Sequence, residues 1–332
     1  MSAPDRVGDD SSKAVMPKTT LGRMDVEVSV IGWGGAGTSG GSDRLERIWD
    51  AANAAGLNFI DTAPAYGFGR SERVVGRAVK GRRDGLVIAT KCGMKWSDES
   101  APITKDSSYD RILFEVDDAL KRMELDVIDL MQVHWPDPER SITEPMEALV
   151  KAQEQGKIRH IGVSNYSVEQ MEEERKVADL VSLQPPYSAF KRDIEADLIP
   201  YCMKSGMAVL PYSPLERGVL TGKFHLDGVE PADDLRRRHP SMQPEQFEAT
   251  KTCLSTLRDI ASGMETTLSA LMIAWTIRQP GITSILVGVR RPSQVAENVA
   301  GGELDLTDDE MNQIDAALKR REEALATAKE GE

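Results

Sequence analysis

Four polar side chains of complementary chemistry lie at, or just beyond, the ends of successive apolar segments: Asp61, Tyr66, Lys91 and His134. A tyrosine hydroxyl has a pKa near ~10 and is poorly matched to neutral pH unless a nearby cation favours its ionised form. Lys91 is predicted to supply that cation, and Asp61 to keep Lys91 charged away from bulk water. His134 can then donate a hydrogen bond to a substrate oxygen. Together the four types predict proton delivery to a developing alkoxide, as the reduction of a carbonyl requires.

Each of these residues also has a structural interpretation when it is taken alone. Asp61 can cap the following helix, Tyr66 can pack in a loop, Lys91 can be surface charge and His134 can be a buried core residue. Their placement at adjacent strand ends favours the catalytic interpretation. Cys92 follows Lys91 directly, but neighbouring residues of a strand point to opposite faces, so Cys92 is expected to pack outward against a helix.

The elements that must position these side chains alternate between short apolar runs and longer amphipathic stretches, which is typical of repeated βα units around a parallel sheet. The strands are predicted at 28–32, 58–61, 86–91, 127–134, 158–164, 181–184, 207–212 and 283–288. Helices are predicted at 42–55, 72–80, 108–123, 143–155, 168–177, 193–205 and 244–264. Cap residues precede several of these helices, and Gly56, Gly156 and Gly206 follow three of them.

Eight strands, mostly followed by helices, predict an α/β fold of the (β/α)8 TIM-barrel type, because a doubly wound sheet uses fewer strands before a second domain begins. Residues 21–28 predict a small hairpin before the first barrel strand, and 307–329 an additional C-terminal helix. We expect a flexible tail at 1–18 and one barrel domain at 19–332. The carboxyl ends of the strands then converge on one mouth, where the irregular segment 213–242 also lies.

Composition limits the classes of partner. The formal net charge of −13 argues against a general affinity for nucleic acid or anionic membrane. The three cysteines are widely spaced, without metal-ligand spacing, so we expect a reduced cytoplasmic protein that holds no metal. The first residues lack the apolar region of a signal peptide, and no run approaches the ~20 apolar residues of a membrane span. The oligomeric state stays open.

Several long motifs, in order and spacing, resemble those of the aldo-keto reductases over residues 21–318. They are Asp61-Thr62-Ala63-x-x-Tyr66-Gly67, Thr90-Lys91, Asp129-Leu130-x-x-x-His134, the segment 156–165 (GKIRHIGVSN) and the segment 212–223 (YSPLERGVLTGK). The sections around Gln132-Val133-His134-Trp135 and Gln184-Pro185-Pro186-Tyr187 are most similar to the branch of bacterial general stress aldo-keto reductases.

The resemblance implies an NADPH-dependent oxidoreductase that reduces an aldehyde or ketone, with Asp61, Tyr66, Lys91 and His134 as its catalytic tetrad and Tyr66 as the general acid. It also implies that NADP(H) lies across the barrel mouth without a Rossmann domain. Ser164, Asn165 and Gln184 would hold the nicotinamide carboxamide, with Tyr212 stacked on the ring. The pyrophosphate would meet Ser213, Leu215, Gly218 and Lys223, and the adenosine end would meet Gly288, Arg290, Gln294, Glu297 and Asn298.

The residue chemistry agrees with these assignments. Segment 288–293 carries two arginines and leads into a helix, so an anion there would meet helix amides and guanidinium groups. This basic cluster in an acidic protein favours NADP over NAD, although the segment can also be a solvated helix start. Residues 236–238, three arginines of the long loop, are predicted to reach over the cofactor and to slow its release.

Two other motifs imitate different nucleotide enzymes. The segment 32–37 (GWGGAG) is a literal G-x-G-x-x-G after a strand, but the next capping signal is delayed to Ser42 or Asp43, which argues against Rossmann binding. Tyr187 and Lys191 have the spacing of a short-chain dehydrogenase pair. Pro185 and Pro186 directly before Tyr187 disfavour the helix that this pair needs.

A second class of function also fits, namely an NADP(H)-binding, redox-sensing subunit with little turnover. The complete tetrad favours an enzyme, and copurified nucleotide without turnover would favour the sensor. Trp33, Phe68, Trp96 and Trp135 are expected to line an apolar pocket for a small carbonyl substrate, or else to pack in the core. Substrate choice is expected to lie in loop 94–104 and in the C-terminal segment.

Overall fold

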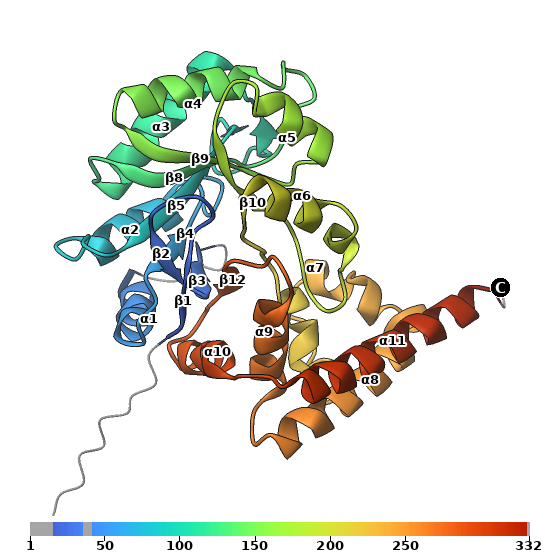
Figure 1. Cartoon of the computed structure of the whole chain (residues 1–332). Coiled ribbons are helices and arrows are strands. Elements are labelled where there is room, and N and C mark those ends of the chain that lie inside the picture. Colours follow the sequence, from blue (N-terminus) through green and yellow to red (C-terminus); the bar gives the residue numbers. More distant parts are fainter. Residues whose placement is uncertain (1–15, 36–41, 331–332) are drawn as a thin grey trace, which may run out of the picture.

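The computed structural model describes residues 16–35 and 42–330. Eight parallel strands follow one another around the sheet in the order β11-β10-β9-β8-β5-β4-β3-β12 (Figure 1). Parallel bridges of Val209 to Ile282 and of Tyr212 to Leu286 join the two edge strands, so the sheet closes. The strands are β3 (Ile31–Gly34), β4 (Phe59–Asp61), β5 (Val87–Cys92), β8 (Ile128–Val133), β9 (Ile158–Ser164), β10 (Leu180–Gln184), β11 (Ala208–Val209) and β12 (Ile285–Gly288). The predicted (β/α)8 barrel is confirmed.

Helices surround the barrel. They are α1 (Ser42–Ala54), α2 (Arg70–Val79), α3 (Tyr109–Met123), α4 (Glu144–Glu154), α5 (Val168–Glu174), α6 (Leu198–Ser205), α8 (Pro244–Gly263), α9 (Leu268–Arg278), α10 (Ser293–Glu303) and α11 (Asp308–Glu330). Shorter helical turns are η2 (Asp193–Glu195), η3 (Glu216–Thr221), α7 (Asp234–Arg237) and η4 (Pro240–Met242). The last helix, α11, lies along α8 outside the barrel (Figure 1).

Helix α9 is the element that the sequence pattern missed. Every residue from Leu268 to Thr276 is buried, so the helix has no polar face and gives no amphipathic period. In the part of the chain that the structure describes, no single helix is long and apolar enough to cross a membrane. Helices α8 and α9 meet that test only as a pair, and they are bent by 92° where they join.

The N-terminal hairpin closes the amino end of the barrel. It pairs β1 (Lys18–Thr20) with β2 (Glu27–Ser29), so the strand predicted at 28–32 is in fact divided between β2 and β3. Leu21 and Val28 are fully buried and pack into the barrel interior beside Phe59. Met16 is also buried, so the described chain packs against the barrel before residue 19; residues 1–15 of the predicted tail lie outside the described residues.

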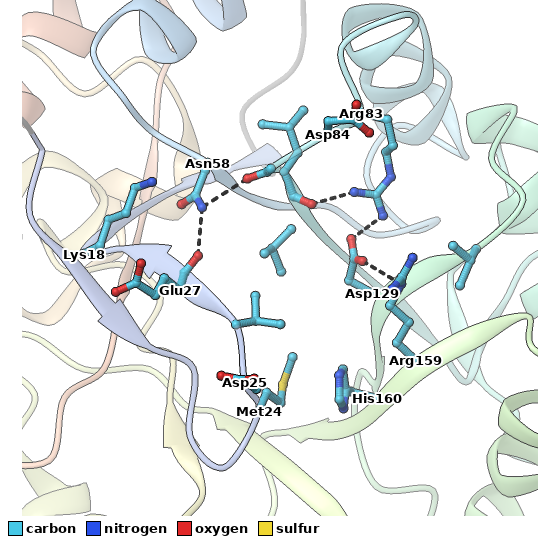
Figure 2. A pocket seen from close by; sticks show the side chains of 15 residues that line it. Lys18, Met24, Asp25, Glu27, Asn58, Arg83, Asp84, Asp129, Arg159 and His160 are labelled. Atoms are coloured by element: carbon cyan, nitrogen blue, oxygen red, sulfur yellow. Dashed lines mark hydrogen bonds and ion pairs between the residues drawn. The ribbon is translucent and has the colours of Figure 1, made fainter.

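A groove of about 460 Å³ lies beside the hairpin at this amino end, away from the predicted mouth (Figure 2). Its principal polar groups already have partners. Asp129 accepts from Arg83 and from the backbone amide of Ile88, and it pairs with Arg159 at 3.2 Å. Asn58 donates to two backbone carbonyls and accepts from the Ser29 amide. These contacts fasten the hairpin and the strand starts together, as expected for the stabilising end of a barrel.

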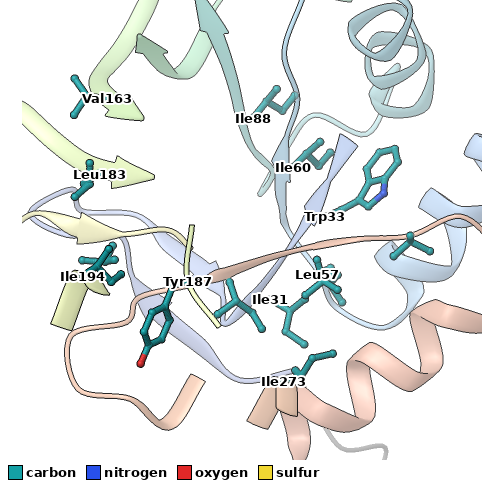
Figure 3. Packing of buried hydrophobic residues seen from close by; sticks show 14 of the residues in the cluster. Ile31, Trp33, Leu57, Ile60, Ile88, Val163, Leu183, Tyr187, Ile194 and Ile273 are labelled. Carbon is teal, nitrogen blue, oxygen red and sulfur yellow. The ribbon is translucent and has the colours of Figure 1, made fainter. Parts of the chain in front are cut away.

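A second apolar layer packs between the strands and the helices (Figure 3). Ile60 and Ile88 point outward into it, whereas their strand neighbours point into the barrel. Trp33 belongs to the same outer layer: it is 1% exposed and its ring centroid lies 6.1 Å from that of Trp49. Of the two expectations for Trp33, packing in the core is therefore confirmed and lining the substrate pocket is wrong. Neighbouring residues of a strand point to opposite faces. Gly32 packs inward against Phe59 and Leu286, so the Trp33 side chain points outward.

Candidate active site

Lys91 and Asp61 form a buried ion pair at the carboxyl ends of β5 and β4. The Lys91 Nζ atom donates to Asp61 Oδ2 at 2.6 Å and to the backbone carbonyl of Thr62 at 2.9 Å. Lys91 is 1% exposed and Asp61 is 3% exposed. A charged pair withdrawn this far from water needs close partners on both sides, and here the ammonium has two acceptors.

Tyr66 lies above this pair, in the turn that follows β4. Its hydroxyl is 3.5 Å from Lys91 Nζ, and the ammonium lies 5.1 Å from the centre of its ring. The His134 ring meets the Tyr66 ring edge-on, with 5.9 Å between centroids. The turn takes this shape because Gly67, Phe68 and Gly69 all have positive φ. The four predicted catalytic residues are therefore brought together.

Electrostatics assign a protonation state to three of the four groups. Burial lowers the pKa of His134 to about 3, with the Lys91 charge acting in the same direction, so the imidazole is neutral at physiological pH. Burial opposes the charge on Lys91, but the Asp61 carboxylate raises the pKa of Lys91 above its ordinary value. Burial raises the pKa of Tyr66, and Lys91 only partly offsets this. Lys91 thus acts on the pKa of Tyr66 in the predicted direction, but burial has the larger effect, and the phenol stays protonated.

The predicted nicotinamide residues form one hydrogen-bonded set beside the tetrad. Asn165, at a left-handed φ of 64°, donates to the His134 carbonyl and to Ser164 Oγ, both at 3.0 Å. The Tyr212 hydroxyl donates to Asn165 Oδ1 at 2.9 Å. Gln184 donates through Nε2 to Asp61 Oδ1 at 2.9 Å, a contact that spacing in the sequence did not reveal. The nicotinamide set and the ion pair therefore share one network.

The predicted pyrophosphate residues occupy a tightly turned loop after Tyr212. Ser213 has φ 61° and Gly218 has φ 101°, and Leu215 precedes η3. A Cβ atom on Gly218 would lie 2.9 Å from Lys223 Nζ, so only glycine lets this lysine approach the loop backbone. Strained backbone of this kind concentrates at ligand sites.

Basic side chains from three segments gather near this loop. Partial burial lowers the pKa of Lys223, and the charges of Arg236, Arg290 and Arg291 lower it further. Arg290 and Arg291 have no ion-pair partner within the described ranges 16–35 and 42–330. Arg236 pairs with Asp233 and Lys223 has Glu297 nearby, so the two arginines at 290 and 291 are the cations left free to meet a multiply charged anion.

The predicted adenosine residues border the cationic rim, which is formed by Lys223, Arg290 and Arg291. Gln294 Oε1 accepts from the backbone amides of Arg290 and Arg291, at 2.9 and 3.1 Å, and so shapes the start of α10 after Gly288. Glu297 lies close enough to Lys223 to raise its pKa in part. Asn298 differs from the others: it is only 5% exposed and borders a small internal cavity beside Trp33.

Among the three arginines predicted to cover the cofactor, Arg236 lies close enough to the cationic rim to lower the pKa of Lys223. Arg236 Nε donates to the Arg217 carbonyl at 3.0 Å, which ties α7 to the loop after Tyr212. Arg237 is exposed and pairs with Asp234 at 3.1 Å. The long loop is therefore folded against the predicted pyrophosphate segment.

Three aromatic residues lie close in sequence to Tyr66, Lys91 and His134 of the tetrad, namely Phe68, Trp96 and Trp135. Phe68 and Trp96 meet edge-on, with 5.7 Å between centroids. Trp135 is 38% exposed, and the Lys105 ammonium lies 5.6 Å from its ring centre. Trp96 directly follows β6 (Met94–Lys95), which pairs with β7 (Thr104–Lys105), and lies in the loop between them, where substrate choice was predicted.

Within the residues that the structure describes, neither imitation motif has the backbone that its type of nucleotide site needs. Gly32 and Gly34 lie within β3 rather than in a turn; Ala36 and Gly37 lie outside the described residues. Tyr187 is not helical, stacks on Trp275 and donates to Glu195 Oε1 at 2.5 Å. Cys92 packs in the outer core as expected, and burial raises the pKa of its thiol well above the usual range.

An acid–base group of this kind, at the mouth of a (β/α)8 barrel and beside a cationic rim, places the chain among barrel oxidoreductases. It belongs to the Aldo/keto reductase family, whose model matches residues 30–319. Aldo-keto reductase YhdN of Bacillus subtilis (strain 168) is 39% identical over 289 residues, covering 84% of this chain and 87% of the relative.

Two further proteins extend the likeness over almost the whole chain. The NADH-specific methylglyoxal reductase of Escherichia coli (strain K12) is 33% identical over 329 residues, covering 92% of this chain and 100% of the relative. The solved structure of the glycerol dehydrogenase AKR11B4 from Gluconobacter oxydans has a TM-score of 0.86 at 37% identity, covering 92% of this chain and 95% of that chain. Family and fold are therefore established by sequence and structure together.

Proposed function

We propose that this protein is an NADPH-dependent reductase of aldehydes or ketones in which Tyr66 is the general acid. The observation that carries the proposal is the contact of a protonated phenol with a buried ammonium, 3.5 Å from the Tyr66 hydroxyl to Lys91 Nζ, beside a neutral imidazole. When bound, the nicotinamide supplies the hydride. Tyr66 gives its proton to the substrate oxygen, and Lys91 stabilises the phenolate that remains.

The other two residues of the tetrad hold this arrangement in place. Asp61 balances the Lys91 charge, which keeps an ammonium in a site almost without water. His134 is neutral, so it can donate one N–H to the carbonyl oxygen without repelling Lys91. Phe68, Trp96 and Trp135 would exclude water from the substrate and favour a carbonyl compound with an apolar body.

The residues present fit a nicotinamide dinucleotide phosphate. Ser164, Asn165 and Gln184 offer amide and hydroxyl groups beside Asp61. In the rim formed by Lys223, Arg290 and Arg291, the two arginines have no ion-pair partner within the described residues and can meet a phosphate. We infer a preference for NADPH from that rim. One relative is named as NADH-specific, so the preference needs a direct test.

The cofactor test compares two arginine variants that change the net charge equally. Arg290→Ala is expected to weaken NADPH binding by about 10-fold and NADH binding hardly at all, because it removes a charge-assisted contact to the extra phosphate. Arg320→Ala, on the exposed face of α11, is the matched control and should change neither affinity. Dissociation constants from titration of nucleotide fluorescence measure both. Equal loss for the two nucleotides would contradict the NADPH preference.

The activity test uses purified protein with NADPH and a panel of carbonyl compounds that includes methylglyoxal and nitrobenzaldehyde. We expect oxidation of NADPH with at least one of them. Tyr66→Phe should then lower kcat by at least ~100-fold, the low end for lost general-acid catalysis, while NADPH binding is kept. A small effect would remove Tyr66 from the role, and copurified nucleotide with negligible turnover would point instead to a redox-sensing subunit.

A further inference from the structure

At the level of Lys91, three of four neighbouring strands carry a polar side chain, and the fourth carries a glycine. Lys91 of β5 is in register with Gln132 of β8, Gln132 with Gly162 of β9, and Gly162 with Ser182 of β10. Gln132 and Ser182 are 0% exposed. A polar side chain this deep in a barrel carries a free-energy cost unless it is hydrogen-bonded, so each one needs an explanation.

Among the described residues, Gln132 has a single side-chain hydrogen bond, which it donates to the carboxylate of the ion pair. Its Nε2 donates to Asp61 Oδ1 at 3.3 Å, while its Oε1 is buried without a partner in the described part of the chain. The reverse orientation of the amide would place Oε1 against the carboxylate, and two acceptors repel. The amide therefore gives up one hydrogen bond of its own in order to donate to Asp61.

The packing around Gln132 leaves it little freedom. A Cβ atom on Gly162 would lie 3.2 Å from Gln132 Cγ and 2.3 Å from Ser182 Oγ, so the glycine leaves room for the side chains on both sides of it. Because proteins pack their interiors closely, the Gln132 side chain is held in this one arrangement.

Asp61 thus has a different set of donors on each oxygen. Oδ2 accepts from Lys91, and Oδ1 accepts from Gln184 at 2.9 Å and from Gln132 at 3.3 Å. Gln184 also belongs to the proposed nicotinamide set, whereas Gln132 lies one level below it. The two amides therefore share an oxygen but differ in whether they face the cofactor.

We propose that Gln132 is a positioning residue that fixes the Asp61 carboxylate and, through it, the place of the Lys91 ammonium under the Tyr66 hydroxyl. Only the reaction served by this arrangement rests on the proposed function. The arrangement itself is a property of the apoprotein and can be tested without turnover.

The first experiment replaces Gln132 by an apolar side chain of similar size. Gln132→Met should lower the single-turnover rate of carbonyl reduction by about tenfold, the low end for a lost hydrogen bond to a charged group, with the Kd for NADPH unchanged. Gln184→Met should lower the rate and weaken NADPH binding as well. Ser182→Ala is the control from the same level, because its hydroxyl does not contact Asp61, and it should leave both quantities unchanged.

The second experiment uses Gln132→Glu and varies the pH. A protonated glutamic acid can donate to Asp61 Oδ1 as the amide does, but an ionised one sets two carboxylates against each other. The other titratable groups at this site are Lys91, Tyr66, His134 and Tyr212, which are also present in Gln132→Met. Relative to Gln132→Met, the glutamate variant should be more active at acid pH and should lose that advantage as the pH rises.

Thermal unfolding of the same two apoproteins gives a readout that does not depend on activity. The folded-state pKa of the new glutamate is expected to exceed its unfolded value, so the glutamate variant should lose stability relative to Gln132→Met as the pH rises between the two. Parallel unfolding profiles, or a wild-type rate for Gln132→Met, would overturn the proposal. A wild-type protein without carbonyl reduction would overturn only the proposed function, and unfolding would still decide the role of Gln132.

Discussion

The two ends of the barrel interior are built from the same strands, yet one is apolar and the other is charged. Strand β4 presents Phe59 inward near the hairpin and Asp61 inward at the mouth; β5 presents Ala89 and then Lys91. A step of two residues along a strand thus moves from close-packed side chains to an ion pair. The difference shows that the residues that stabilise the barrel and the residues proposed for its chemistry lie at different positions along the barrel axis.

The energetics of the two ends differ in kind. At the amino end, each buried apolar side chain stabilises the fold by leaving water, whatever its neighbours are. At the mouth, burial of Lys91 and Asp61 is unfavourable, and the site is tolerated only because every charge has close donors or acceptors. Removing one group should therefore have different consequences at the two ends.

The largest effect is expected for Lys91→Met, which leaves a buried carboxylate without its cation. We expect a loss of about 3–5 kcal/mol in the free energy of unfolding, together with a fall in kcat of at least ~100-fold. Denaturant titration and steady-state kinetics measure the two effects. The double variant Asp61→Asn/Lys91→Met should recover most of the stability and none of the turnover, and a double variant as unstable as Lys91→Met would contradict the buried-pair argument.

At the amino end of the barrel, Phe59→Ala should destabilise the protein about as much as Lys91→Met does, without changing the catalytic rate. Phe59 is 0% exposed and packs against the hairpin residues, so its truncation leaves a cavity that costs about 3–5 kcal/mol. The kcat per folded molecule should stay near the wild-type value. Phe114→Ala on α3, where the ring is 55% exposed, is the control and should change the free energy of unfolding little. A large loss of kcat in Phe59→Ala would show that the two ends are coupled.

The sequence was sufficient for the barrel and for the meeting of Asp61, Tyr66, Lys91 and His134. Parallel strands end at a common mouth, so residues at the ends of successive strands must be near one another whatever the details of packing. This is a constraint of topology. Capping residues and glycines then placed most helix boundaries within a few residues, as at Gly206, which has a φ of 66° in the C-cap of α6.

Individual hydrogen bonds could not be predicted in the same way. Gln132 and Gln184 both donate to Asp61 Oδ1, and these contacts depend on side-chain packing that only the folded barrel fixes. Trp33 shows that side-chain direction in a strand is equally hard to predict. A shift of one residue along the strand turns a side chain from the barrel interior to the outer core. Helix α9 could not be predicted because it is almost completely buried, and a buried helix lacks the alternation of apolar and polar faces on which helix prediction depends.

Glu174 is a buried carboxyl group outside the barrel and gives the smallest predicted effect. It ends α5 and is 0% exposed. The Tyr166 hydroxyl lies near enough to act on its pKa as a hydrogen-bond donor, although neither carboxyl oxygen has a partner of ordinary hydrogen-bond geometry in the described chain. Burial raises the pKa of Glu174 to about 8, and Tyr166 offsets this only in part. Asp61, equally buried, has three donors. Glu174 is therefore expected to be neutral where Asp61 is charged.

The pH dependence of stability follows from this raised pKa. The unfolded chain releases the Glu174 proton near pH ~4.3, whereas the folded chain keeps it to a pH of about 8, so stability falls as the pH rises between these values. Glu174→Gln is neutral throughout and should reduce the fall in Tm between pH 5 and pH 8 by about 2–4 °C. Glu172→Gln, exposed on the same helix, should not. The prediction fails if the Tm of the wild type and that of Glu174→Gln change in parallel over this pH range. The carboxyl group would then be solvated or paired, and burial would not predict the charge of a carboxyl group in this protein.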